Sequence, residues 1–370
     1  DNEDNYYFVS SFSGIITLAP GVFIDSGSPQ QTHIVVSKFN KEDKLLWYKI
    51  LKVRDPTKVS PFTWAIHIDQ QDNLFILVDH SHEPLIYDNI PILYNNINLK
   101  YNTTIIKLNQ NGNLVWSKPI QSPNGGVVLF NIKSDNTGNI VVIGNTYEKS
   151  IQIDQHTYFN SDQSSIPNAD AVAFKLTSDG EVLWLRGYGS GQTHDYFAGL
   201  EIDFWGNIYI SGVSSLLGPY KILDSLINDP NLIHPSFIAM VDSNGNRKWI
   251  KVIDLGPVNN LGYFTEMTKE NKLITTWSLA KDSVVIDDRV IFRIGKGTDA
   301  QYDMIYLITD TSGLIENAFC WGGNDFDRIL DVSLQSDGGV IISGQFSSDT
   351  LTLGEHSLYK FFNKPTGNLS

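Results

Sequence analysis

The 370-residue sequence predicts an all-β protein built from one repeated unit, and three observations lead to this prediction. Short runs rich in Ile, Val, Tyr and Phe alternate with turns rich in Asp, Asn and Gly, which is typical of strands joined by tight reversals. No segment shows sustained helical periodicity. Two independent sets of turn residues each recur at intervals of 65 to 69 residues. A long period of this kind indicates a repeat architecture.

The two sets of turn residues define the repeated unit. The first set precedes a strand in six copies and consists of Asp4, Asp72, Gly138, Gly206, Asn271 and Gly338. The second set precedes another strand in five copies and consists of Asp43, Gly112, Gly180, Gly245 and Gly313. Four residues after the first four of these comes a tryptophan, at Trp47, Trp116, Trp184 and Trp249. In the fifth copy that position is Asn317.

Each unit divides into four predicted strands, which we name A to D. Strand A is an alternating run before the first turn, as in Thr63–Asp69, Phe197–Asp203 and Ile329–Gln335. Strand B follows that turn. Strand C lies at Ile34–Phe39, Thr104–Leu108, Ala171–Leu176, Phe237–Val241 and Met304–Ile308. Strand D follows the second turn and carries the tryptophan. The aspartates three residues before the first turn residue, such as Asp69, Asp135 and Asp203, are expected to cap the reversal.

A further hairpin is predicted between strands B and C. Its pattern is seen at Ile15–Asp25, Ser150–Asn160, Ser283–Ile294 and Thr350–Phe362. This insertion explains why the unit is ~67 residues long, whereas a plain four-stranded propeller blade needs about 40–50.

Four antiparallel strands repeated in this way predict a β-propeller of six repeats, each blade carrying the extra B–C hairpin. A parallel β-helix has far shorter coils and no hairpin turns, so it does not fit. We expect a single propeller domain over residues 1–370. Its repeat units lie at about 1–60, 61–125, 126–194, 195–259, 260–326 and 327–370.

The first and last copies are incomplete in the predicted strand order. Copy 1 lacks strand A, and copy 6 lacks strands C and D. We therefore expect the closing strands to lie outside this chain or to come from another chain, and seven blades in the full-length protein is the alternative. Because unpaired apolar edges recruit other chains, we expect this stretch alone to form dimers or aggregates.

The composition excludes several classes of protein. Lys and Arg number 27 and Asp and Glu 41, which gives a formal net charge of −14. Such an acidic chain does not suit a nucleic-acid groove or docking by charge on anionic lipid. Cys320 is the only cysteine, so no internal disulfide and no Cys-based metal centre can form. No apolar run approaches the ~20 residues that span a bilayer. We predict no nucleic-acid binding, no membrane insertion and no cofactor.

Several motifs recur in the order of a known repeat. They include the SFSG segment Ser11–Gly14, the GNIYISG segment Gly206–Gly212, the AFKLTSDGEVLW segment Ala173–Trp184 and the GGNDFD segment Gly322–Asp327. In these motifs the chain resembles the repeat of secreted bacterial β-propeller proteins of the SBBP type, over nearly its whole length. The resemblance implies a secreted protein, or one on a cell or particle surface, with an adhesive or structural role.

The chain departs from this repeat in two copies. Copy 5 has Asn271-Lys272 in place of the Gly-Asn turn and lacks the tryptophan. Copy 4 carries a divergent B–C link with Pro219, Pro230 and Pro235. The motifs are turn and packing residues, so they are specific for the fold and say little about function.

The function expected first is that of a non-enzymatic binding or structural scaffold, alone or within a larger assembly. The D–A connections share one face with the B–C links, and such loops are the usual binding surface of a propeller. We expect this face to contact protein or glycan. The candidate binding residues in it are His194, Asp195, Asn324, Asp325 and Asp327.

A second, enzymatic interpretation rests on strand A. Five residues before the first turn residue, the copies carry a ring of mostly polar side chains, namely His67, Lys133, Glu201, Glu266 and Ser333. Because innermost strands line the central channel, these side chains are expected to face it. Glu201 and Glu266 lie on adjacent blades and could act as the paired carboxylates of a polysaccharide hydrolase or lyase. The alternative interpretation is a hydrated channel wall.

Three further patterns have a binding and a structural interpretation. His80 and His82 form the only His-x-His and could hold a metal ion with a carboxylate, or lie in a solvated loop. The turn at Asp242 offers one carboxylate, which favours turn capping over calcium binding. The tryptophans could stack on sugars, but their fixed register favours packing between neighbouring blades.

Overall fold

The structure, a computed structural model, contains only β-strands as regular elements in the part of the chain that it describes. That part comprises residues 1–53, 61–81, 84–92, 101–122, 124, 126–191, 193–214, 220–222, 225–227, 232, 235–256, 264–294, 302–335 and 337–360. Neighbouring strands pair in antiparallel fashion in these sheets. The predicted all-β class is therefore confirmed. Over the same residues there is no helix of the length and apolarity that a membrane crossing requires.

Repeats 2 to 5 each form a four-stranded sheet in the spatial order A-B-C-D. Repeat 2 contains β6 (Phe62–Ile68), β7 (Leu74–Ser81), β10 (Tyr101–Leu108) and β11 (Leu114–Ser122). Repeat 3 contains β12 (Val127–Ser134), β13 (Ile140–Thr146), β16 (Asp170–Leu176) and β17 (Val182–Tyr188). Repeat 4 contains β18 (Asp195–Ile202), β19 (Ile208–Ser214), β22 (Ser236–Val241) and β23 (Arg247–Ile253). Repeat 5 contains β24 (Phe264–Met267), β25 (Lys272–Leu279), β28 (Asp303–Asp310) and β29 (Ile315–Trp321).

The first and last repeats have fewer strands in the described residues. Repeat 1 provides strands B, C and D as β1 (Tyr6–Ser13), β4 (Thr32–Phe39) and β5 (Leu45–Val53). Repeat 6 provides strands A and B as β30 (Asp327–Leu334) and β31 (Val340–Phe346), which form a two-stranded sheet.

A short hairpin follows strand B in every repeat, and in repeats 1 to 5 it lies between strands B and C, as predicted. The six hairpins are β2 (Ile15–Ala19) with β3 (Val22–Asp25), β8 (Leu85–Tyr87) with β9 (Ile90–Pro91), β14 (Ser150–Ile153) with β15 (His156–Phe159), β20 (Tyr220–Ile222) with β21 (Ser225–Ile227), β26 (Ser283–Ile286) with β27 (Arg289–Phe292), and β32 (Thr350–Leu353) with β33 (His356–Tyr359).

The hairpins of repeats 2, 3 and 5 contact the outer strand of the preceding repeat. β8 of repeat 2 pairs directly with β5 of repeat 1. Lysines of strand D form ion pairs with the hairpin aspartate of the next repeat, and the N–O distances are 2.5 Å for Lys49–Asp88, 2.8 Å for Lys118–Asp154 and 2.7 Å for Lys251–Asp287. Exposed pairs of this kind add little stability, but they help to fix the register between repeats.

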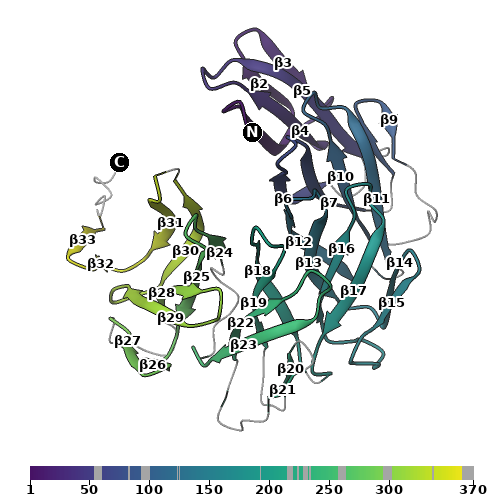
Figure 1. The fold of residues 1–370 in the computed structure, drawn as a ribbon. Coiled ribbons are helices and arrows are strands. Elements are labelled where there is room, and N and C mark those ends of the chain that lie inside the picture. The colour runs from purple at the N-terminus through teal and green to yellow at the C-terminus, as the bar shows by residue number, and fades with distance from the viewer. Residues whose placement is uncertain are drawn as a thin grey trace, which may run out of the picture.

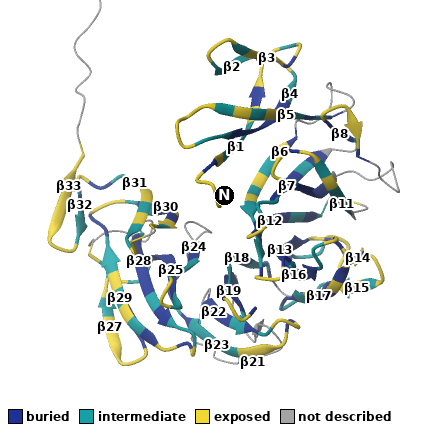
Figure 2. Ribbon diagram, turned by 45° about the horizontal axis from the view of Figure 1, so that its top comes forward, coloured by how far each residue is buried: buried dark blue, intermediate teal, exposed yellow. Residues whose placement is uncertain are grey.

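The sheets follow one another in chain order around an arc, from the purple β1 sheet to the yellow-green β30–β31 sheet (Figure 1). Strand A of each repeat lies innermost, since β6, β12, β18, β24 and β30 contact one another in succession. Strands β13, β16 and β19 are buried along their whole lengths, and the exposed residues lie mainly in turns and outer hairpins (Figure 2).

The apolar core is divided into layers that lie between consecutive sheets. One layer joins repeats 2 and 3, with Phe75 and Leu129 among its members. Further layers join repeats 3 and 4, repeats 4 and 5, repeats 1 and 2, and repeats 5 and 6. Each sheet of repeats 2 to 5 therefore buries both of its faces against its neighbours, and burial of this apolar surface is the main stabilising contribution.

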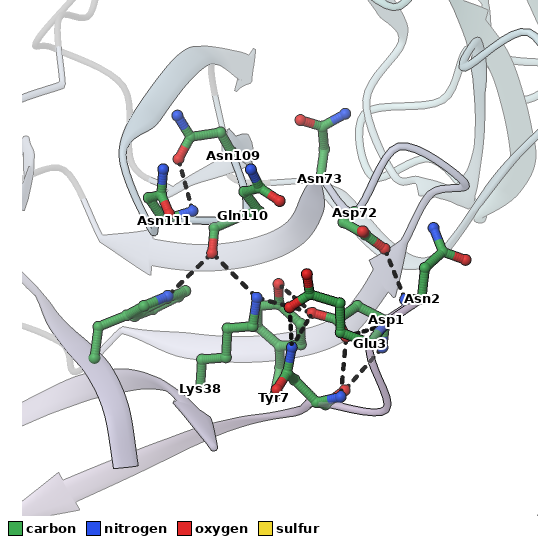
Figure 3. Close-up of polar contacts among 12 residues, drawn as sticks. Asp1, Asn2, Glu3, Tyr7, Lys38, Asp72, Asn73, Asn109, Gln110 and Asn111 are labelled. Atoms are coloured by element: carbon green, nitrogen blue, oxygen red, sulfur yellow. Dashed lines mark hydrogen bonds and ion pairs between the residues drawn. The ribbon is translucent and has the colours of Figure 1, made fainter. Parts of the chain in front are cut away.

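The tryptophan of strand D connects each repeat to the next one. Its indole Nε1–H donates to a backbone carbonyl in the C–D turn of the following repeat, with N–O distances of 3.0 to 3.1 Å. The four pairs are Trp47–Gln110, Trp116–Ser178, Trp184–Ser243 and Trp249–Thr311. In the first pair the Lys38 ammonium donates to the same Gln110 carbonyl at 3.3 Å (Figure 3). The packing interpretation of these tryptophans agrees with this geometry.

Each indole ring also lies against the glycine of the turn that it bonds. Gly245 has φ +79°, and a Cβ atom built on it would meet the Trp184 ring at 3.2 Å. Gly112, Gly180 and Gly313 face Trp47, Trp116 and Trp249 in the same way. Glycine is required here both by the left-handed backbone and by the close approach of the ring.

The aspartates that precede the turns cap them, as expected. In repeat 4, Asp203 Oδ1 accepts hydrogen bonds from the backbone N–H groups of Trp205 and Asn207, at 2.9 and 2.8 Å. Asp69 and Asp135 make the equivalent bonds. Asp242 uses its Oδ1 atom in the same way in the C–D turn. These carboxylates are committed to local turn geometry.

Candidate functional site

Alternation of strand direction gives the protein two distinct faces. The A–B and C–D turns lie together on one face, which we call the turn face. The B–C links and D–A connections lie on the opposite face, which we call the loop face. The candidate binding residues of the sequence belong to the loop face, and the polar ring lies between the two faces on the innermost strands.

The innermost strands bring three charged side chains together. Lys133 of β12 lies between Glu201 of β18 and Glu266 of β24, which occupy the same position in successive repeats. The Lys133 Nζ atom is 2.9 Å from Glu201 Oε2 and 3.5 Å from Glu266 Oε1. The side chains are 21%, 12% and 30% exposed, respectively, so the cluster is largely removed from water. Three of the five predicted ring positions therefore form one cluster.

The cluster shifts the pKa values of its members. Burial raises the pKa of Glu266, and the nearby Glu201 carboxylate raises it further, while Lys133 opposes this effect. Burial alone would lower the pKa of Lys133, but the two glutamates outweigh it and raise that pKa. At neutral pH the cluster thus holds a firmly protonated ammonium beside two glutamates, and the pKa of Glu266 is raised.

This geometry bears on the enzymatic interpretation. A glycosidase pair must leave room for the sugar and the attacked bond between its carboxyl groups. Here the Lys133 ammonium occupies a bridging position between Glu201 and Glu266 and is within ion-pair distance of both. The two ion pairs are suited to linking the inner strands β12, β18 and β24. The raised pKa of Glu266 is the one feature that also suits a general acid.

His67 of β6 takes a separate role in the ring. Its Nε2 atom accepts a hydrogen bond from the Ser134 backbone N–H at 2.9 Å. That nitrogen therefore carries no proton, and the imidazole is in its neutral form. Burial, together with the nearby Lys133 charge, lowers the pKa of His67 to about 3. Ser333, the fifth ring position, is exposed.

On the loop face, an aromatic cluster surrounds one of the predicted binding residues. His194 lies in the D–A connection before β18, and its ring centroid is 5.8 Å from that of Tyr147 and 5.9 Å from that of Tyr196. The hydroxyl oxygens of the two tyrosines are 3.4 Å apart. His194 Nδ1 accepts a hydrogen bond from the Ala169 backbone N–H at 2.9 Å, which fixes the orientation of the imidazole. Tyr147 is 38% exposed, so the cluster is open to a ligand.

Asp195 lies between His194 and Tyr196 in the chain and is buried. Its carboxylate accepts hydrogen bonds from the Ser190 backbone N–H at 2.8 Å and from the hydroxyl groups of Ser190 and Ser214. Burial raises the pKa of Asp195 to about 6 in spite of these bonds. Asp195 therefore supports the loop from below and is not placed to contact a ligand directly.

The predicted binding residues of repeat 6 likewise comprise a buried aspartate and residues that are exposed. Asp327 is the equivalent of Asp195, is buried, and accepts a hydrogen bond from the Ser348 hydroxyl at 2.8 Å. Asn324 and Asp325 are exposed. Asn324 exchanges hydrogen bonds with Asp349, at 3.1 and 2.9 Å, and Asp325 Oδ1 accepts one from the Phe326 backbone N–H. Asn324 and Asp325 are therefore accessible to a ligand, whereas the buried Asp327 fixes the neighbouring loop through its bond to Ser348.

The His-x-His pattern is only half described. His80 is buried, and its Nε2 atom is 2.9 Å from the Thr104 hydroxyl, so that nitrogen faces a strand residue. His82 lies outside the described residues. Within the described ranges, no group of three or more His, Cys, Asp or Glu side chains is placed to hold a metal ion.

Sequence reasoning identified His194 but missed the two tyrosines that complete its cluster. Tyr196 is next to Asp195 in the sequence, and Tyr147 directly follows a strand B in repeat 3. A search for aromatic residues at the loop-facing ends of adjacent repeats would have found both, because the repeat brings the end of one strand B beside the start of the next strand A.

Comparisons with known proteins return no family model and no curated protein that matches the sequence. Among solved structures, an apocarotenoid oxygenase of Synechocystis aligns with a TM-score of 0.39 and 9% identity, over 86% of this chain and 64% of that one. The exotype rhamnogalacturonan lyase YesX gives 0.34 and 12%, over 95% and 69%. The endosialidase of phage phi92 gives 0.33 and 10%, over 100% and 70%. The alignment thus spans less than two thirds of the oxygenase.

Proposed function

We propose that this chain is a β-propeller of six repeats that acts as a non-enzymatic binding scaffold and contacts a protein or glycan through its loop face. The observation that carries the proposal is the cluster of Tyr147, His194 and Tyr196. Its rings come from two adjacent repeats and are held in fixed orientations, and Tyr147 is open to solvent. Aromatic side chains with polar atoms are the residues most often found at the centres of binding surfaces.

The proposal includes a secreted or surface location, in agreement with the SBBP-type repeat motifs. It also includes an adhesive or structural role, either alone or within a larger assembly. The buried aspartates Asp195 and Asp327 support this role, because each accepts hydrogen bonds from a loop of its own part of the loop face and so preorganises it.

A retention assay tests the proposal. Labelled protein is applied to immobilised polysaccharides and to immobilised cell-surface proteins, and the variant Tyr147→Ala, His194→Ala is compared with the natural sequence. We expect retention on one class of surface and its loss in the variant. The control is Leu314→Ala, because Leu314 is 56% exposed in the C–D turn of repeat 5, on the opposite, turn face. No retention, or retention unchanged in the variant, contradicts the proposal.

A second candidate function is a polysaccharide hydrolase or lyase that uses Glu201 and Glu266. The raised pKa of Glu266 favours it, since a general acid must be protonated near working pH. Release of reducing ends or of unsaturated products from a panel of polysaccharides, abolished by Glu266→Gln, would establish this activity. The scaffold proposal expects no such release.

A further inference from the structure

The A–B turn of repeat 4 differs from the other described A–B turns in a way that folding does not require. Its two central residues are Phe204 and Trp205, which are 69% and 66% exposed. The equivalent residues in the other fully described turns are polar and exposed, namely Asn2-Glu3, Gln70-Gln71, Asn136-Thr137 and Lys269-Glu270.

The turn itself is formed by other residues. Asp203 accepts the backbone hydrogen bonds, and Gly206 adopts the left-handed conformation with φ +81°. The side chains at positions 204 and 205 are mostly exposed, and large apolar side chains in water bring no stability. An exposed aromatic pair at a position that is polar in four other repeats points to a binding role.

The pair is held in a defined geometry. The Phe204 and Trp205 rings meet edge to face, with centroids 6.1 Å apart and planes at 89°. The Asn136 side-chain amide donates to the Phe204 carbonyl at 2.8 Å and so ties the turn to the preceding repeat. The equivalent bond joins Asn2 of repeat 1 to the Gln70 carbonyl of repeat 2 at 3.0 Å, so it forms whether the residue in the turn is polar or aromatic. The two rings therefore stand on a preorganised turn.

The surroundings indicate the chemistry of the ligand. The neighbouring turns at residues 135–139, 177–181, 242–246 and 268–272 carry no exposed large apolar side chain, and they are rich in amides and hydroxyls. A protein partner of standard size covers about 800 Å² per side around an apolar centre, which two rings amid polar turns do not supply. A sugar ring needs only one aromatic surface for its C–H face and polar groups for its hydroxyls.

We propose that Phe204 and Trp205 form a second binding site, on the turn face, that takes a pyranose ring of a neutral oligosaccharide. The net charge of −14 disfavours anionic saccharides at this surface. The site lies on the face opposite the Tyr147–His194–Tyr196 cluster and does not depend on the function proposed for that cluster.

Titration calorimetry with maltohexaose, cellohexaose, mannohexaose and N-acetylchitohexaose tests the site. The variant Phe204→Gln, Trp205→Gln gives repeat 4 the polar turn that repeat 2 already carries, so the fold is retained. We expect at least one of these oligosaccharides to bind the natural sequence and to bind the variant at least about tenfold more weakly, by analogy with base stacking on aromatic side chains. Phe292→Gln, an equally exposed aromatic elsewhere, should bind as the natural sequence does.

Three outcomes would overturn the proposal. One is that none of the four oligosaccharides binds the natural sequence. Another is that binding is unchanged in the double variant, which would place the saccharide elsewhere, for example on the loop face. The third is self-association or capture of a purified protein that depends on the pair while no saccharide does, which would make this turn a protein contact.

Discussion

At the scale of single residues, Trp184 of repeat 3 and Trp205 of repeat 4 have opposite environments. Trp184 is 6% exposed, and its Nε1–H donates to the Ser243 carbonyl at 3.0 Å. Trp184→Ala should lower the free energy of unfolding by about 3–5 kcal/mol, because it removes a buried ring that joins two sheets. Trp205→Ala should change it by no more than about 0.5 kcal/mol, because Trp205 is exposed. Urea denaturation of both variants measures this, and equal losses would contradict the packing role of Trp184.

His67 makes stability depend on pH in a defined direction. Its folded pKa of about 3 lies below the ordinary value of about 6.5, so the folded state resists protonation. The stability that His67 contributes is present above about pH 6.5 and is lost as the pH falls toward 3, by at most about 1.4 kcal/mol per pH unit. In His67→Gln, the decline of melting temperature between pH 6.5 and 4 should therefore be shallower.

The control for this measurement is His356→Gln, because His356 is exposed on β33. Its pH profile should match that of the natural sequence. If His67→Gln shows the same acid sensitivity as the control, the buried hydrogen bond to the Ser134 N–H does not hold the imidazole neutral.

At the scale of elements, the turns of repeat 4 contain two glycines that are required for different reasons: Gly206 for its backbone conformation alone, and Gly245 also for the close approach of a ring. Gly206 and Gly245 have nearly the same φ, +81° and +79°, but Gly206 has only the Ser243 Cβ at 3.9 Å, whereas Gly245 faces the Trp184 ring at 3.2 Å. Gly206→Ala should cost about 1–2 kcal/mol, the penalty of a left-handed backbone. Gly245→Ala should cost at least about 1 kcal/mol more, because the ring must move. Thermal unfolding of the two variants measures the difference, and equal costs would mean that the ring yields freely.

Most of the strands and turns could be predicted from the sequence, because the residues that reveal the repeat are the same residues that form its turns. Asp203, Gly206 and Gly245 have the conformations that their residue types indicate, and the strands and hairpins begin close to the predicted positions. The path of the B–C hairpins could not be predicted in the same way. The pairing of β8 with β5 depends on contacts between repeats, which a periodic pattern within one repeat does not encode.

The site was predictable only in part, for a related reason. The ring positions follow from the register of strand A, but the bridge from Lys133 to both Glu201 and Glu266 depends on the distance between adjacent sheets. The burial of Asp195 and Asp327 could not be foreseen either, because a loop aspartate that supports its backbone looks in sequence like one that awaits a ligand. Phe204-Trp205 carried a readable signal, since it departs from the polar residues of the equivalent turns.

At the scale of the whole molecule, both ends of the arc present apolar strand surface. Tyr6 and Phe8 of β1 are 42% and 54% exposed, and Ile341 of β31 is 53% exposed. Ile66 is 40% exposed, although its equivalent Ile132 is buried in repeat 3. Beside β31 lies an apolar hollow of about 410 Å³ that the β32–β33 hairpin also lines. These surfaces resemble the interfaces between consecutive sheets elsewhere in the molecule.

Such edges should make the 370-residue chain self-associate as its concentration rises. Phe8→Lys should reduce this association, because a charge on an exposed strand opposes pairing with another chain. Phe23→Lys, at a residue that is 66% exposed on the β2–β3 hairpin, should leave it unchanged. Light scattering over a concentration series measures the effect. A monomer at all concentrations would mean that these edges are not competent to pair.

The bonds from tryptophan to carbonyl all run in one direction along the chain. Trp47, Trp116, Trp184 and Trp249 each bond the repeat that follows and never the repeat that precedes. During synthesis the amino-terminal repeats leave the ribosome first. In repeats 1 to 4 the indole therefore lacks its carbonyl partner until about sixty further residues have been made, as the 62-residue separation of Trp116 and Ser178 illustrates. We therefore expect the repeats to acquire their contacts in order from the amino terminus, each newly made repeat covering the tryptophan of the one before it.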